Sequence, residues 1–205
     1  ILLLCLDLDG TLLGPDKQVS PVCREMLHEI RGTGVAIAIA SGRHPFNVFA
    51  LMDFLRLPHT ATCLSGAVAF LNGREILSHK IDPVVMREII GIAEKNDIYV
   101  SVSGSDFNLI YGPINRWTSS TSTAVSRYTR CTSYRELASR ATELAPRVLK
   151  CALHATTDEL YDHLRDELSA LDDVEVAQSD THWVDITAKD CTKAEGVRAL
   201  AASLK

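Results

Sequence analysis

The sequence lacks the short motifs that identify several large enzyme classes. It has no Walker loop and no GxSxG elbow, and Gly32-Thr33-Gly34 lacks the third glycine of a dinucleotide-binding loop. None of the seven histidines has the HExxH spacing of a metalloprotease, so each is expected at the surface or in the core. These absences argue against P-loop nucleotide hydrolysis, dinucleotide-dependent redox chemistry, serine-hydrolase chemistry and zinc proteolysis.

Paired cysteines and long hydrophobic runs are also missing. None of the six cysteines forms a CxxC pair, and Cys5 and Cys151 lie inside apolar runs. This pattern is typical of reduced thiols in an intracellular protein and argues against a disulfide framework or a zinc site. The apolar N-terminus is too short for a signal peptide, is interrupted by Asp7, and is followed by no run as long as a membrane span. We therefore expect a cytoplasmic protein with no membrane partner. Because the chain begins without Met and inside a strand, we also expect a trimmed N-terminus.

Positive charge is scarce as well. The chain has 21 Lys and Arg residues against 26 Asp and Glu residues, a formal net charge of -5. This balance favours neither nucleic acid nor an anionic membrane surface as a partner. An anionic substrate would have to be held by single cations such as Arg43 and Lys193. At 205 residues and 46% hydrophobic composition, the chain is expected to bury an ordinary core, in one large domain or two small ones.

The most informative stretch is Asp7-Leu8-Asp9-Gly10-Thr11, which ends the apolar run of residues 1–6. Side chains alternate along a strand, so the two aspartates point to the same side. Two carboxylates that close repel each other unless a cation lies between them, and Mg²⁺ accepts one or two carboxylates together with phosphate oxygens. Gly10 allows a sharp turn near a ligand, and Thr11 offers a hydroxyl and an N–H. The stretch predicts a nucleophile, a proton carrier and a metal acting on a phosphate. The alternative is a strand that ends in ordinary polar turn residues.

A strand–helix–strand unit is expected to bring a second polar segment to this place. Residues 1–6 and 35–40 are apolar throughout and are predicted to be buried strands, and Ser20-Pro21 predicts the start of a helix between them. Such a unit is almost always a right-handed crossover between parallel strands. Parallel strands end at the same edge, where open α/β sheets bind ligands. We therefore expect Ser41-Gly42-Arg43 beside the two aspartates.

The pattern of predicted helices and strands changes after residue 78. Asn72-Gly73 predicts a hairpin turn, and helices are then expected from Pro83, near 134–143, at 157–171 and from about Thr192. Short strands are predicted at 98–103, 107–111, 147–154, 174–178 and 182–187, and a Ser-, Thr- and Arg-rich loop at 113–130. This arrangement predicts an α/β core at 1–78 and 188–205, with an α+β insert at 79–187. An insert beside the ligand edge of a sheet is well placed to act as a lid.

Five side chains are candidates for chemistry at this edge. Asp7 can attack phosphorus to give an aspartyl-phosphate, and Asp9 can protonate the leaving oxygen and then activate water. Ser41 can donate a hydrogen bond to a phosphate oxygen, and Arg43 offers a planar donor fork. Lys193, at the start of the last helix, can offset the repulsion between a carboxylate and a phosphate. The alternatives are an ordinary turn at Ser41, a surface Arg43 and a solvated Lys193.

Together these segments resemble the haloacid dehalogenase-like (HAD) phosphatase superfamily, and within it the Cof-type group with a large type IIB cap. The pentapeptide at 7–11 resembles the first motif, and Ala40-Ser41-Gly42-Arg43 resembles the second. Ser65-Gly66-Ala67 is similar to the Asn-Gly-Ala turn of Cof-type members. Lys193 is similar to the Lys of the third motif, although Ala194 replaces its common Gly.

The resemblance implies a Rossmann-like parallel-sheet core with an inserted α+β cap at 79–187 that chooses the substrate. It implies a Mg²⁺-dependent phosphatase that hydrolyses a small phosphorylated metabolite, a sugar phosphate above all, through an aspartyl-phosphate. Asp7 would be the nucleophile and Asp9 the acid/base, and Mg²⁺ would be bound by Asp7 and by the Asp9 carbonyl. Lys193 would be catalytic as well. The residues assigned to substrate binding are Gly10, Thr11, Ser41, Gly42, Arg43 and Lys193.

One element of the resemblance is missing from this sequence. The fourth motif, Gly-Asp followed by a second acidic pair, should follow the Lys193 helix, whereas the chain ends at Lys205. Asp172-Asp173 lies upstream and is a poor substitute. We therefore expect either a fragment or a degenerate relative. A phosphotransferase or phosphomutase on the same scaffold and a non-enzymatic binding module remain as alternatives, and the oligomeric state is left open.

Overall fold

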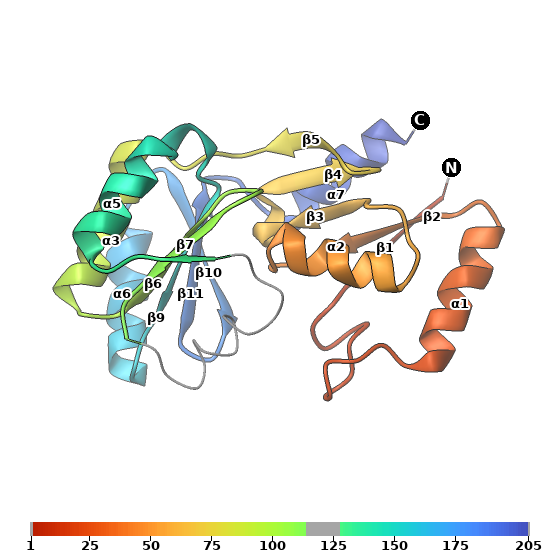
Figure 1. Ribbon diagram of the computed structural model, residues 1–205, viewed down its shortest axis with the longest axis horizontal. Coiled ribbons are helices and arrows are strands. Elements are labelled where there is room, and N and C mark those ends of the chain that lie inside the picture. Colours follow the sequence, from red (N-terminus) through yellow and green to blue (C-terminus); the bar gives the residue numbers. More distant parts are fainter. Residues whose placement is uncertain (1, 114–127, 205) are drawn as a thin grey trace. The chain divides into compact units, whose positions relative to one another are not determined.

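The structure is a computed structural model that describes residues 2–113 and 128–204 (Figure 1). The fold is α/β, and the chain divides into two compact units, Ile1–Ser78 with Thr192–Lys205 and His79–Cys191. Residues 188–191, which the sequence analysis placed in the core, belong to the second unit. The last strand of that unit continues to Ala188, and the Lys189 N–H donates to the Asp173 carbonyl at 3.0 Å.

The first unit is built on a five-stranded sheet in the order β1-β2-β3-β4-β5. Strand β1 (Leu3–Asp7) is parallel to β2 (Ala36–Ala40), with Asp7 opposite Ala40, and β2 is parallel to β3 (Ala61–Cys63). Strands β4 (Val68–Leu71) and β5 (Arg74–Ser78) then run antiparallel to their neighbours. The predicted hairpin at Asn72-Gly73 joins these two strands, and both residues have positive φ. The ends of β1 and β2 therefore meet at one edge.

Helices connect and cover this sheet. Helix α1 (Pro21–Gly32) begins as expected, because Ser20 accepts a hydrogen bond from the Cys23 N–H at 3.1 Å. Helix α2 (Pro45–Phe54) packs against β3, and its Val48 and Met52 are fully buried. Helix α7 (Lys193–Ser203) packs across β2 to β5, where Leu200 shares a core cluster with Ala38 and Ala69. The last helix of the chain thus belongs to the same unit as the first strand.

The first strand is more exposed than its sequence predicts, and the helix that follows it is largely exposed as well. Strand β1 is only half-buried along its length, because β2 is its single neighbour in the described sheet and β1 forms an edge. Helix α1 buries Leu27 alone, whereas Val22 and Met26 are 64% and 54% exposed. Residues 1–6 were predicted to form a strand covered on both faces. Within the part of the chain that the structure describes, this prediction is wrong.

The second unit is built on a six-stranded sheet in the order β10-β11-β9-β6-β7-β8. Its strands are β6 (Tyr99–Ser103), β7 (Asn108–Tyr111), β8 (Thr129–Arg130), β9 (Lys150–His154), β10 (Val174–Asp180) and β11 (Trp183–Ala188). The helices described in this unit are α3 (Pro83–Lys95), α5 (Tyr134–Glu143) and α6 (Asp158–Ser169). Each of these contributes to one apolar cluster with alternate residues of the central strands. The helices therefore cover one face of this sheet, as Figure 1 shows.

The sequence mislocated two strands of this unit. Residues 145–147 form a short 3₁₀ turn around Pro146, so the strand predicted from 147 begins at Lys150 instead. Residues 129–130, predicted as loop, form β8 and pair in parallel with β7. The remainder of that predicted loop, 114–127, lies outside the described residues. None of the described helices combines the length and the apolar character that a membrane crossing requires.

The six cysteine side chains differ sharply in access, which gives a direct test of the fold. Cys23 is exposed, Cys5 is half-buried, and the other four are buried. Burial raises the pKa of the Cys151 thiol to about 12 and raises the pKa of Cys63 as well. We expect one fast-reacting thiol in the native protein when it is titrated with a thiol reagent, and Cys23→Ser should remove it. Fast labelling of several thiols in the native state would contradict the packing described here.

Candidate active site

The carboxyl end of β1 presents two aspartates within one tight turn. Asp7 is the last residue of the strand, and its carbonyl accepts from the Leu12 N–H at 3.3 Å, while the Leu8 carbonyl accepts from Leu13 at 2.8 Å. Gly10 adopts φ +77°, a left-handed conformation that glycine reaches at little cost. Leu8 is fully buried between the two aspartates, whose side chains are partly exposed. The turn therefore keeps both carboxylates at the open edge of the sheet.

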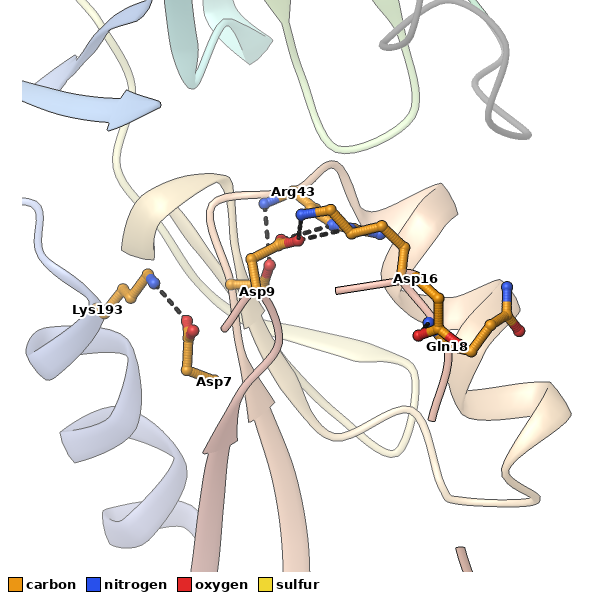
Figure 2. A network of polar contacts seen from close by, with 8 residues as sticks. Asp7, Asp9, Asp16, Gln18, Arg43 and Lys193 are labelled. Atoms are coloured by element: carbon orange, nitrogen blue, oxygen red, sulfur yellow. Dashed lines mark hydrogen bonds and ion pairs between the residues drawn. The ribbon is translucent and has the colours of Figure 1, made fainter. Parts of the chain in front are cut away.

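Asp7 is held by the lysine predicted from the far end of the chain. Lys193 Nζ lies 2.6 Å from Asp7 Oδ1, although 186 residues separate the two in sequence. Thr192 caps α7 by accepting from the Glu195 N–H at 3.3 Å, so Lys193 is the first helical residue. Figure 2 shows the two side chains turned toward each other at the edge of the sheet. The ion pair leaves both groups partly open to solvent, with 46% and 37% of the Lys193 and Asp7 side chains exposed.

Asp9 is held by two cations of its own. Arg43 binds both of its oxygens, with Nε 2.8 Å from Oδ2 and Nη2 2.7 Å from Oδ1, and Lys17 Nζ lies 2.9 Å from Oδ1. Figure 2 shows this group beside the Asp7–Lys193 pair. The hydrogen bonds from Arg43 are the largest cause that lowers the pKa of Asp9, to about 2. Asp9 is therefore a carboxylate at neutral pH in this structure.

The segment that follows β2 is tied down by the turn after β3. The Ser41 side chain is buried, and its Oγ accepts from the Arg43 N–H at 3.2 Å. The Ser41 and Arg43 carbonyls accept from the Ser65 and Leu64 N–H groups at 3.2 and 3.0 Å. These bonds orient the Arg43 backbone toward Asp9. They also place the Ser41 hydroxyl inside the turn rather than in solvent.

The start of α7 is fixed by close backbone contacts with the same turn. Gly66 has φ +107°, and a Cβ built on it would lie 2.1 Å from the Thr192 carbonyl oxygen. A Cβ on Gly196 would lie 2.0 Å from Oγ1 of Thr62 in β3. Only glycine fits at either position, because any side chain would push α7 away from the sheet. The short turn Leu64–Gly66 thus supports both the Ser41–Arg43 segment and Lys193.

The residues present offer two oxygen ligands for a hard divalent cation. The Asp7 carboxylate is partly open, and the Asp9 carbonyl accepts no hydrogen bond from the described residues. Mg²⁺ commonly binds one or two protein oxygens and completes its shell with water and phosphate oxygens. The described residues contain no cluster of three or more His, Cys, Asp or Glu side chains suited to a metal. The donor set fits an oxygen-seeking ion in its chemistry and supplies two protein ligands.

The structure brings together four of the side chains chosen from the sequence: Asp7, Asp9, Arg43 and Lys193. Thr11 lies exposed in the turn after Gly10, Gly42 is half-buried between Ser41 and Arg43, and Ser41 itself is buried. Sequence reasoning missed Lys17, which contacts Asp9 from a turn eight residues downstream. The turn signal Gly14-Pro15-Asp16 indicates that the chain reverses before Lys17, but not which side chain the lysine reaches.

Comparisons with known proteins bear on the family and the fold of the chain. A family model described as haloacid dehalogenase-like hydrolase matches residues 4–205. The 5-amino-6-(5-phospho-D-ribitylamino)uracil phosphatase YwtE of Bacillus subtilis is 30% identical over 104 residues, 50% of this chain and 36% of that protein. The pyridoxal phosphate phosphatase YbhA of Escherichia coli is 32% identical over 83 residues, 40% of this chain and 30% of that protein. The alignments thus span about a third of the length of these curated relatives.

Solved structures extend the likeness to the whole described fold. A haloacid dehalogenase-like hydrolase from B. subtilis superimposes with a TM-score of 0.84 at 19% identity, over 100% of this chain and 79% of that chain. At this identity the match concerns the fold alone. It covers both compact units of the chain.

The contact between Gly66 and Thr192 predicts a position where one methyl group disturbs the site. Gly66→Ala should destabilise the protein by about 2–4 kcal/mol, since it adds a left-handed alanine and a backbone clash. Gly32→Ala is the matched control, because a Cβ there meets nothing within 4 Å, and its effect should stay within about 1 kcal/mol. Denaturant unfolding measures both. Equal effects of the two substitutions would show that the turn does not support α7.

The pKa of Asp9 provides a second test. It is held at about 2 mainly by Arg43, so Arg43→Met should raise it toward the ordinary value of 3.8, and Lys17→Met should raise it less. The folded pKa is depressed, so this contact stabilises the fold fully above about pH 4 and ceases to do so as pH falls through about 2. NMR titration of the aspartate carboxyl carbons measures the shift. A wild-type Asp9 pKa close to 4 would show that Arg43 and Lys17 do not hold Asp9 as described.

Proposed function

Because this chain belongs to the haloacid dehalogenase-like hydrolase family, we propose that the protein is a phosphatase acting on a small phosphorylated metabolite. We infer a sugar or sugar-alcohol phosphate as the substrate class and Mg²⁺ as the metal. The names of the two curated relatives support a small phosphate ester, and one of them contains a phospho-D-ribityl group. The oxygen donors at the end of β1 favour a hard divalent ion.

One observation carries the proposal: two carboxylates at the end of a single strand are each held by a different cation. Lys193 binds Asp7, and Arg43 with Lys17 binds Asp9. A carboxylate that attacks phosphorus must approach a phosphate that is itself negative, so positive charge has to be placed beside both. A carboxylate that exchanges protons needs separate partners that orient it. The contacts of Lys193 with Asp7 and of Arg43 with Asp9 support both roles.

The proposed reaction has two steps. An oxygen of Asp7 forms a bond to phosphorus while the ester P–O bond breaks. Asp9, which has to take up a proton from solvent when the ester binds, gives that proton to the leaving oxygen. Asp9 then takes a proton from water as that water attacks the phosphorus of the aspartyl-phosphate. Cleavage of the acyl phosphate restores Asp7 and releases inorganic phosphate. One group thus performs the nucleophilic work and the other the proton transfers.

The neighbouring residues have supporting roles in this proposal. Lys193 would offset the charge of Asp7 and of the incoming phosphoryl group, and Arg43 would orient Asp9 and contribute donors to the phosphate. The exposed Thr11 hydroxyl, next to Gly10, would offer a donor, since the Thr11 N–H already donates to the Leu8 carbonyl at 3.3 Å. Ser41 with Gly42 would fix the second loop and contribute donors to the phosphoryl group. The Asp7 carboxylate and the Asp9 carbonyl would hold the divalent ion. When bound, that ion supplies charge neutralisation for the phosphate oxygens.

We propose in addition that the second unit, residues 79–191, acts as the cap that selects the substrate. Its sheet has two unlike faces. Val100, Val102, Leu153 and Ile186 point into the helix-covered core. The alternate residues of the same strands include six of the ten buried polar residues of the described chain: Ser101, Ser103, Lys150, His154, Asp185 and Thr187. Tyr99, Ala152 and Trp183 lie on the same face, and Lys150 pairs there with Asp185. A face that combines aromatic and polar side chains supports a recognition role.

The assignment of the nucleophile is tested by a charge-removing substitution in the full-length protein. Asp7→Asn should lower kcat for a generic aryl phosphate by about 1000-fold or more, since the amide cannot form the intermediate. Asp53→Asn is the control: Asp53 lies on α2 and pairs with His59 after that helix, so its substitution should leave kcat unchanged. Steady-state release of inorganic phosphate measures both. Undiminished turnover by Asp7→Asn would refute the assigned nucleophile.

A further inference from the structure

Lys17 is presented to the site by a tightly bonded turn. The Gly14 N–H donates to the Gln18 carbonyl at 3.0 Å, and the Lys17 N–H donates to the Gly14 carbonyl at 2.9 Å. Asp16 Oδ1 accepts from the Gln18 N–H at 3.0 Å, and Lys17 adopts φ 60°. A lysine in the left-handed region is uncommon, and the hydrogen bonds of this turn stabilise it here. The turn therefore fixes the point on the backbone from which the Lys17 side chain extends.

The Lys17 ammonium has hydrogen-bond donors that Asp9 does not use. It can donate three hydrogen bonds, and within residues 2–113 and 128–204 it makes one, to Asp9 Oδ1 at 2.9 Å. Its side chain is 63% exposed, so it is not a packing element. Arg43 by itself already engages both oxygens of Asp9. Orientation of Asp9 therefore does not explain the presence of a second cation.

We propose that Lys17 is a specificity-determining residue that binds an anionic group on the leaving-group side of the phosphate ester. The inference rests on the proposed function, in which Asp9 faces the leaving oxygen. An ammonium 2.9 Å from Asp9 then lies within a few atoms of the carbons attached to that oxygen. A carboxylate or a second phosphate on those carbons can bind Lys17 while the contact with Asp9 is kept.

The distribution of cations supports this side of the ester rather than the transferred phosphoryl group. Lys193 serves Asp7, where phosphorus would be attacked, and Lys17 and Arg43 serve Asp9. Lysine acts as a point charge on a flexible stem, which suits recognition of an anion whose position varies between substrates. The substrate class inferred from Lys17 is a phosphate ester that carries a second negative group close to the ester oxygen.

Two matched pairs of esters test this in the full-length protein. Glycerol 2-phosphate and 2-phosphoglycerate differ by a hydroxymethyl group against a carboxylate on the ester carbon, and glycerol 1-phosphate and glycerol 1,2-bisphosphate differ by a second phosphate on the adjacent carbon. Lys17→Met should raise KM for the anionic member of at least one pair by about tenfold. It should leave KM for the neutral member within about twofold, and any change in kcat that follows from the lost contact with Asp9 should be the same for both members of a pair. Lys17→Arg should retain the wild-type preference. The pair that responds identifies the anion.

Equal changes within both pairs, or no change in either, would overturn the proposal. A binding measurement separates this result from a failure of the proposed function. Calorimetric titration of Asp7→Asn and of the Asp7→Asn, Lys17→Met double variant with the same esters reports on Lys17 without turnover. Tighter binding of an anionic ester that is lost with Lys17 supports the assignment even if the wild type hydrolyses none of them. Absence of that difference refutes it.

Discussion

Two like charges at the end of one strand set the terms for the whole first unit. Asp7 and Asp9 lie two residues apart at an open sheet edge, and each must be stabilised by cations that come from elsewhere in the chain. The 2.6 Å pair between Lys193 and Asp7 joins residues 186 positions apart, so the first strand and the last helix belong to one unit although a second unit is inserted between them. Arg43 reaches Asp9 only because β1 and β2 are parallel and end together. Charge compensation thus depends on the topology of the sheet.

Backbone contacts, rather than the charges themselves, position the cations beside the two aspartates. Exposed ion pairs contribute little stability and do not place a helix by themselves. Helix α7 is placed by Gly66 and Gly196, where the chain approaches Thr192 and Thr62 more closely than any side chain allows. The turn containing Gly66 also holds the Ser41 and Arg43 carbonyls. The short turn Leu64–Gly66 therefore positions both the start of the helix that carries Lys193 and the backbone of Arg43.

The sequence predicts the parts of this site that depend on periodic structure. Apolar runs and the Ser20-Pro21 cap are local signals, and the parallel crossover that they imply brings Arg43 to Asp9. The signals fail where the determinant is not local. Lys17 reaches Asp9 from an irregular turn without periodicity, and β8 has two residues, too few for a pattern. The apolar run of β1 predicts burial on both faces, yet burial depends on neighbours, and β1 has one in the described sheet. Caps and crossovers can be inferred from residue types, whereas edges and loop contacts require the assembled chain.

The state of Asp9 in this structure limits how the proposed reaction can begin. A carboxyl group with a pKa of about 2 carries no proton at neutral pH, so in this arrangement Asp9 is suited to accept a proton from water rather than to donate one. Arg43 is the main cause, because its fork binds both carboxylate oxygens. The same donors suit a phosphate dianion, which offers more charge than one carboxylate. A bound phosphate that draws Arg43 away would therefore weaken the strongest influence on Asp9 and raise its affinity for a proton. Arg43 thus orients Asp9 in the free protein, and its release from Asp9 on phosphate binding would allow Asp9 to take up a proton.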